Sequence, residues 1–306
     1  MADTRTVTRH DRADAAPLAA LFLGALAMGI SPIFVRLAEV GPFASAFWRV
    51  AGALPLLYLW AAYEARSEGE AQSAVLRLDG AILTAGLLFG GDLIFWHLAI
   101  LHTSVANATF LATLAPVWVA LGSGLLIGET VGRETVGGLL LCLGGAAALI
   151  GTSATLRPDH LDGDLFGLAT SFFFGMYFLA VRSARRRSGP GRIVFLSSAI
   201  SAAALFAVAL FAGDRIFPPG LAGWAALAGL AVVSHTGGQG LLTYALGHLP
   251  AAFSALVIFI EAVAAAAFAW LFLDEPVTLV QAVGGVLIIA GIAAARPGRK
   301  PAPAGP

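Results

Sequence analysis

Two stretches of the 306-residue chain, LIGETVGRETVGGLLL at 126–141 and LDEPVTLVQAVGGVLI at 273–288, follow the same order. In each, a long apolar segment ends at a glutamate, Glu129 or Glu275, and a second apolar segment containing Val-Gly-Gly begins soon afterwards. A carboxylate beside a helix N-terminus is stabilising by about 0.3–1 kcal/mol when it is exposed. We therefore expect these glutamates to set the turns before the segments that follow them.

The similarity extends far beyond these two stretches. At a constant shift of 146 residues, identical residues fall on one another from one end of the unit to the other: Gly29 on Gly175, Arg36 on Arg182, Gly91 on Gly237, His102 on His248 and Glu129 on Glu275. Chance similarity between two strings rich in Leu, Ala and Gly is the alternative, but it does not explain the polar matches. The sequence predicts two repeats, at 17–152 and 162–295, between polar tails at 1–16 and 296–306.

Apolar residues make up 58% of the chain and charged residues only 12%. The charges cluster between apolar segments that reach the roughly 20 residues a helix needs to cross a bilayer. Helices are expected because an open sheet would leave backbone polar groups unpaired in lipid. Ten candidate spans follow: 17–38, 42–63, 79–101, 104–127, 133–152, 162–183, 192–213, 220–243, 250–273 and 277–295.

Each repeat thus contains five spans, and an odd number makes the second copy enter the membrane from the opposite side. Inverted repeats are typical of secondary transporters, whose binding site lies between the two halves near the bilayer midplane. The predicted fold is an all-α membrane protein of ten transmembrane helices, arranged as two inverted-topology five-helix repeats around a central cavity.

Lysine and arginine collect on one side of these spans, and the side that collects them is normally cytoplasmic. One side holds fourteen of them: Arg5, Arg9, Arg12, Arg66, Arg77, Arg133, Arg182, Arg185, Arg186, Arg187, Arg192, Arg296, Arg299 and Lys300. The other side holds three: Arg36, Arg157 and Arg215. We expect a bacterial inner-membrane protein with both termini in the cytoplasm.

Three segments carry a resemblance to a known family: AFWRVAGAL at 46–54, SVANATFLATLAPVWVALGSGLLIGETV at 104–131 and FIEAVAAAAFAWLFLDEPV at 259–277. Over about residues 18–295 the chain resembles the EamA type of the drug/metabolite transporter superfamily. That family commonly has Glu-Pro in the ninth helix, where this chain has Glu261-Ala262 and keeps a proline only in the first copy, at Pro116. The resemblance implies a central cavity and export of small metabolites, often amino acids.

Four ionisable side chains lie inside predicted spans, where charge is costly and usually turned towards protein or water: Arg49, Asp92, His97 and Glu261. One interpretation is an ion pair of Arg49 with Asp92 or Glu261 that fixes helix register. The other is that Arg49 binds a substrate carboxylate, or that a carboxylate carries a proton. Asp92 and Trp96 share a helix face, whereas His97 points elsewhere.

Further candidates for the cavity are aromatic or polar residues within spans: Trp96, Trp118, Tyr177, His235 and Gln239. Trp and Tyr also collect at membrane interfaces, and the glycines beside Gln239 serve either a helix break or close packing. Candidates for hinges or close helix contacts are Pro32, Gly86, Gly90, Gly175, Gly237 and Gly238. The lone cysteine, Cys142, has no partner in the chain for a disulfide.

The motifs of other function classes are missing from the sequence. It has no nucleotide-binding G-x-x-x-x-G-K-[ST], and no H-E-x-x-H or G-x-S-x-G of an enzyme. FGGD at 89–92 only partly resembles the Gly-x-Gly-Asp of membrane aspartyl proteases. We expect a non-enzymatic exporter of apolar or aromatic amino acids, with no cofactor, metal or nucleic acid and with proton coupling as a hypothesis. The alternatives are a transporter of drugs, quaternary cations or sugar phosphates, and, remotely, an intramembrane enzyme.

Overall fold

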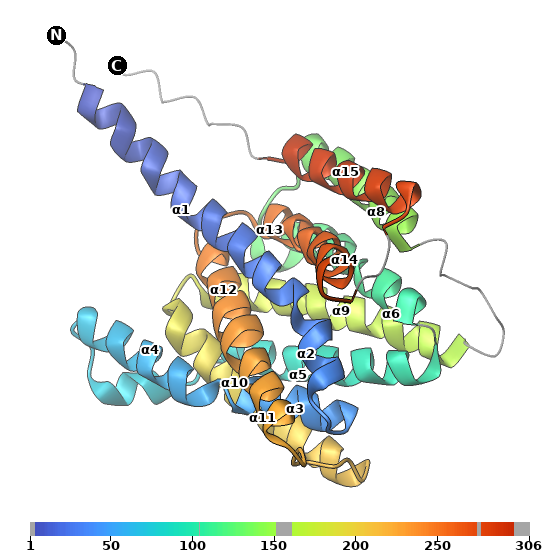
Figure 1. Cartoon of the computed structure of the whole chain (residues 1–306). Coiled ribbons are helices and arrows are strands. Elements are labelled where there is room, and N and C mark those ends of the chain that lie inside the picture. The colour runs from blue at the N-terminus through green and yellow to red at the C-terminus, as the bar shows by residue number, and fades with distance from the viewer. Residues whose placement is uncertain (1–3, 104, 151–160, 274–276, 297–306) are drawn as a thin grey trace.

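The computed structural model describes residues 4–103, 105–150, 161–273 and 277–296, and within them every regular element is a helix (Figure 1). Four residues used above, Arg157, Glu275, Arg299 and Lys300, lie outside the described residues. The first repeat contains α1 (Thr4–Gly29), α2 (Ser31–Leu37), α3 (Pro42–Ala51), α4 (Leu54–Ser67), η1 (Gln72–Leu76), α5 (Gly80–His102), α6 (Val105–Ala112), α7 (Ala115–Gly122), η2 (Ser123–Ile127) and α8 (Arg133–Ile150). The second contains α9 (Leu161–Ala184), α10 (Pro190–Phe211), α11 (Leu221–Gly229), η4 (Leu230–Gln239), α12 (Gly240–Leu246), α13 (Ala251–Val257), α14 (Phe259–Leu273) and α15 (Leu279–Ala294).

The expected spans coincide with helices or with pairs of consecutive helices, but the count of ten is not confirmed in full. Among the described residues, eight helical segments are long and apolar enough to cross a membrane. The last helices of the two repeats, α8 and α15, are not among the eight. With 16 residues, α15 is about 24 Å long, which is less than the roughly 30 Å of a bilayer core.

The two repeats interlock rather than standing side by side. α5 of the first repeat packs along α9 of the second repeat. The corresponding helices pack in the same way with the repeats exchanged: η4 and α12 of the second repeat pack along α1 of the first. The final helices α8 and α15 lie against each other (Figure 1). Because corresponding helices of each repeat pack against the other repeat in the same way, both repeats contribute residues to one hydrophobic core.

Large apolar side chains cover the outside of the bundle as well as its core. Leu125 is 88% exposed and Phe211 is 93% exposed, while Leu57 and Phe253 are buried. An exposed apolar surface of this kind marks contact with a membrane in a chain whose helices have spanning length. The protein is therefore a multi-pass membrane protein.

Small residues allow helices to approach closely at three crossings. A Cβ atom on Gly175 of α9 would lie 2.7 Å from the carbonyl oxygen of Ala115, and one on Gly238 would lie 2.5 Å from Met28 Cγ. Gly86 is similarly close to Ile200, whereas Gly90 and Gly237 have room for a methyl group at ordinary contact distances. The first three glycines are therefore required by packing.

For the glycines beside Gln239, in TGGQG at 236–240, the sequence left open a helix break or close packing. Residues 230–239 wind as a π-helix, η4, which continues directly into α12. Here the wider turn places Gly238 against α1 and keeps His235 and Gln239 buried.

Replacing Gly175 with valine should lower the thermal midpoint of the detergent-solubilised protein. The added side chain meets the backbone of α7, so α9 must move, and overpacking of this kind costs about 1–3 kcal/mol. Gly137→Ala is the matched control, because a Cβ there has nothing within 4 Å. It should leave the midpoint unchanged or raise it, since alanine favours helix more than glycine does. Equal midpoints for the two variants would contradict the packing argument.

Candidate functional site

Among the described residues, three of the interrupted membrane spans have their interruption at one cavity. The first span breaks between α1 and α2 at Ile30, the fourth between α6 and α7 at 113–114, and the ninth between α13 and α14 at Ile258. The breaks in the fourth and ninth spans are related by the repeat. Interrupted helices in corresponding positions of two repeats are a general feature of transporter binding sites, because they free backbone groups to face a cavity.

Proline accounts for two of the three breaks. Pro32 and Pro116 stand in the first turns of α2 and α7, where the missing N–H leaves a carbonyl of the preceding turn without its usual donor. Pro32, a candidate hinge in the sequence, thus lies at the interruption of the first span. Ala262 occupies the position that matches Pro116, yet the second-repeat helix still breaks at Ile258. The break in the second repeat therefore does not depend on a proline.

The cavity between the repeats has a volume of about 170 Å³. Helices of both repeats supply its walls, so neither repeat could form it alone. Its lining consists of Met28, Ser31, Pro32, Arg49, Phe89, Asp92, Leu93, Trp96, Thr109, Ala112, Thr113, Ala115, Pro116, Thr170, Phe174, Phe178, Ala255, Ile258, Phe259, Glu261 and Ala262.

One cation and two carboxylates from three separate spans lie on this lining: Arg49 on α3, Asp92 on α5 and Glu261 on α14. Among the described residues, Arg49 forms no ion pair within 4 Å, so the contact pair with Asp92 or Glu261 is not seen. Instead its Nη1 donates a long hydrogen bond of 3.4 Å to Ser31 Oγ. Its Nε is buried and has no hydrogen-bond partner in the described part of the chain.

In this arrangement the charges of Arg49, Asp92 and Glu261 share one cavity, but Arg49 is not paired with either carboxylate by direct contact. Arg49 interacts electrostatically with Glu261 and with Asp92 across the cavity, without touching either. A buried polar group without a partner costs about 1–3 kcal/mol, and more when it is charged. The site can therefore gain stability from a ligand that offers an acceptor to Arg49 and donors to the two carboxylates.

Aromatic rings form the apolar part of the cavity wall. Trp96 lies one helical turn beyond Asp92 on α5, as the spacing predicts, and Phe89, Phe174, Phe178 and Phe259 complete the surface. Aromatic walls with a few convergent polar groups are typical of sites for small organic molecules.

His97 and Trp118 do not line the cavity. His97 Nδ1 lies 2.7 Å from the carbonyl oxygen of Leu93 on the same helix, and its ring packs against Phe43. Trp118 turns towards α9, where its Nε1 donates a 2.9 Å hydrogen bond to Ser171 Oγ. Both side chains thus have protein partners and are absent from the cavity lining.

Tyr177, His235 and Gln239 form a second buried polar group behind Phe89. Gln239 Nε2 donates to the Tyr177 hydroxyl at 2.8 Å, and His235 Nε2 lies 2.7 Å from Ser198 Oγ. Phe89 packs on the rings of both Tyr177 and His235, at centroid distances of 5.0 and 5.5 Å. Tyr177 and His235 therefore contact the cavity lining through Phe89, and Gln239 is hydrogen-bonded to Tyr177.

Several cavity residues were not singled out from the sequence, among them Ser31, Thr113, Thr170 and Phe259. Ser31, Thr113 and Phe259 stand at the three helix breaks. The prolines Pro32 and Pro116 are the sequence signal that could have pointed to Ser31 and Thr113. The repeat, which aligns Ala262 with Pro116, could then have pointed to Phe259. In the described residues, His, Cys, Asp and Glu do not gather in groups of three or more that could hold a metal ion.

Comparison with known proteins agrees with this architecture. The sequence matches the EamA-like transporter family over residues 16–151 and again over 161–295, once for each repeat. The chain belongs to this family. A solved structure with a TM-score of 0.76 covers 92% of this chain and 97% of its own, at 19% sequence identity, and so shares the fold.

Two known transporters are more similar to this chain in sequence. The pseudopaline exporter CntI of Pseudomonas aeruginosa is 31% identical over 208 residues, which are 68% of this chain and 72% of that protein. An uncharacterized transporter of Archaeoglobus fulgidus is 30% identical over 196 residues, 63% of this chain and 68% of its own length. The expected resemblance to EamA transporters is thus confirmed.

Proposed function

We propose that this EamA transporter exports a small zwitterionic metabolite, such as an apolar or aromatic amino acid or a compound derived from one. The observation that carries the proposal is the buried Nε of Arg49, which has no partner among the described residues although Asp92 and Glu261 share its cavity. A substrate carboxylate would satisfy Arg49, and a substrate ammonium would lie between the two acidic side chains.

The size and walls of the cavity support a small cargo. Its volume of about 170 Å³ is below the roughly 300–1,000 Å³ that is common for drug-sized ligands. The aromatic side chains at Phe89, Trp96 and Phe259 favour an apolar or aromatic substituent on the cargo. The relative CntI, a pseudopaline exporter, supports export as the direction of transport.

Other cargo classes fit the charges less well. A sugar phosphate usually calls for several Arg or Lys side chains, and among the described residues Arg49 is the one cationic residue on the cavity lining. A quaternary cation would be attracted by two carboxylates and by aromatic faces, but it would leave Arg49 without a partner. The zwitterion is the class that engages all three charges.

Counterflow in proteoliposomes tests this assignment. Vesicles loaded with unlabelled compound should accumulate labelled leucine or phenylalanine, but not labelled sugar phosphate or tetraalkylammonium. The matched controls are the amide of the same amino acid, which lacks the carboxylate, and its N-acetyl form, which lacks the ammonium. Each should exchange about 10- to 100-fold more slowly, because each loses a charged hydrogen bond. Fast exchange of the quaternary cation with none of the amino acid would replace the zwitterion by the drug-type cargo.

A further inference from the structure

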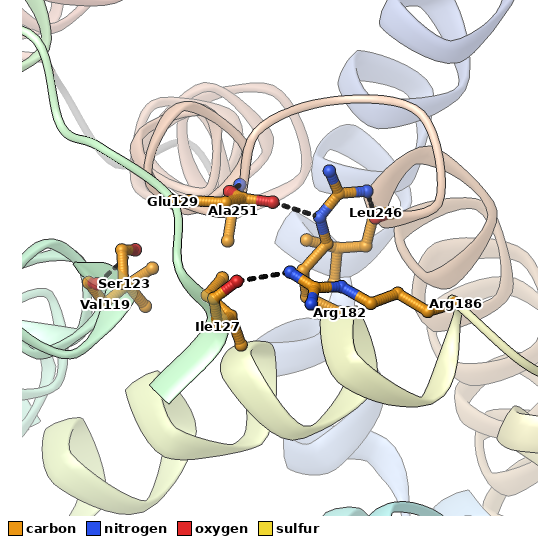
Figure 2. Close-up of polar contacts among 8 residues, drawn as sticks. All are labelled: Val119, Ser123, Ile127, Glu129, Arg182, Arg186, Leu246 and Ala251. Carbon is orange, nitrogen blue, oxygen red and sulfur yellow. Dashed lines mark hydrogen bonds and ion pairs between the residues drawn. The ribbon is translucent and has the colours of Figure 1, made fainter. Parts of the chain in front are cut away.

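Glu129 joins the two repeats on the face that carries Arg182, Arg185, Arg186, Arg187 and Arg192, here called the arginine-rich face. Its Oε1 accepts a 2.5 Å hydrogen bond from Arg182 Nε on α9, as Figure 2 shows. Its Oε2 accepts a 2.9 Å hydrogen bond from the backbone N–H of Ala251, the first residue of α13. One carboxylate from the first repeat thus holds two helices of the second.

Two arginines extend this contact. Arg182 Nη1 donates a 2.7 Å hydrogen bond to the carbonyl oxygen of Leu246 at the end of α12, and Arg186 donates to the carbonyl oxygen of Ile127 at the end of η2 (Figure 2). We call this set, Glu129 and the two arginines with their backbone partners, the latch. It gathers the ends of η2, α12 and α13 around α9.

The expectation that Glu129 sets the turn before α8 therefore needs correction. Its side chain does lie at a helix N-terminus, but the helix is α13 of the other repeat. The sequence could not reveal this partner, because Ala251 is 122 residues away along the chain. Only the interlocking of the repeats brings the two together.

The latch lies directly beyond one end of the cavity. Phe178 of the cavity lining precedes Arg182 by four residues on α9, and Ala255 follows Ala251 by four residues on α13. Four residues of helix correspond to about 6 Å. The end of the cavity is thus separated from the arginine-rich face by one helical turn and by the latch.

We propose that the latch is the gate of the cavity at the arginine-rich face, closed in this structure and opened once in every transport cycle. The inference rests on the proposed function, in which cargo must reach the cavity from both faces. The side chains of Arg182 and Glu129 are 20% and 19% exposed, so water reaches the ion pair. Ion pairs that water reaches are weak enough to be exchanged for solvation when the helices part.

Cysteine accessibility tests the gate without any cargo. In a Cys142→Ala background, a single reporter, Ala112→Cys, is placed on the cavity lining and a membrane-impermeant maleimide is applied to one face of sealed vesicles. Labelling from the arginine-rich face should be slow. Glu129→Gln should accelerate it roughly fivefold, since loss of the latch shifts the population towards the open form. Arg182→Gln should do the same.

The matched control is Glu70→Gln, which removes a 3.4 Å ion pair with Arg192 on the same face but outside the latch and the cavity. Labelling should then stay at the parent rate. The double variant Glu129→Gln/Arg182→Gln should label no faster than either single variant, because both remove one interaction.

Unchanged labelling in both latch variants, or an equal rise with Glu70→Gln, would overturn the gate. Because the maleimide needs no substrate, the gate can fail while amino-acid counterflow succeeds, and the reverse. The two proposals are therefore tested separately.

Discussion

Arg49→Gln should reduce counterflow of a zwitterionic substrate by about 30-fold or more, since truncating one partner of a buried charged contact costs about 2–5 kcal/mol. The reason is geometric. Arg49 is the one cationic residue on the cavity lining, and its Nε has no protein partner in the described part of the chain that could substitute for the cargo. The measurement is the initial rate of exchange in proteoliposomes at matched protein content.

Two further variants serve as controls for Arg49→Gln. Arg49→Lys should keep only part of the activity, because a lysine retains the charge but not the planar fork that binds a carboxylate through two nitrogens. Arg66→Gln removes an arginine at the end of the same span, at the surface and away from the cavity, and should exchange like wild type. Wild-type exchange by Arg49→Gln would remove Arg49 from the binding site.

Glu261→Gln should abolish acceleration by a proton gradient while exchange without a gradient persists. Glu261 lies on the cavity wall beside the break at Ile258, and its backbone N–H bonds to the Ile258 carbonyl oxygen at 2.8 Å. A carboxylate in this place can take up a proton from the cavity when cargo leaves, and a glutamine of the same shape cannot. The measurement is substrate movement driven by acid on the face towards which the cargo moves.

The variant Asp92→Asn distinguishes the role of Asp92 from that of Glu261, the other carboxylate of the cavity. If Glu261 carries the proton, Asp92→Asn should weaken substrate binding but keep the response to the gradient. Glu68→Gln, at the exposed end of α4, is the control for loss of an acidic residue outside the cavity. Full transport by Glu261→Gln with unchanged pH dependence would end the hypothesis of proton coupling through this residue.

The positions of the helices followed from apolar segments and their breaks, because lipid leaves the backbone few alternatives. Pro32 likewise marked one interruption, whereas Pro116 was noted only as the proline kept in the first copy. The break at Ile258 could not be predicted in this way, since Ala262 replaces the proline of the first copy. The count of ten spans was also only partly confirmed, because the sequence does not show how far α15 extends across a bilayer.

The charged residues of the cavity could be predicted for the same reason: a charge inside a span needs a polar neighbour or water. Which of the aromatic and histidine residues join them could not be predicted. Trp118 and His97 bind Ser171 and Leu93, and these choices depend on helix rotations that hydropathy does not record. The contact between Glu129 and Ala251 was missed because it crosses between repeats.

Counterflow of one labelled zwitterion by the wild-type protein and by Arg49→Gln, reconstituted side by side, tests the central claim most directly. The claim is that one cavity, built by both repeats, binds the cargo through Arg49. We predict accumulation in wild-type vesicles and none above empty vesicles for the variant. Equal accumulation by both proteins, or no accumulation of any zwitterion by the wild type, would contradict it.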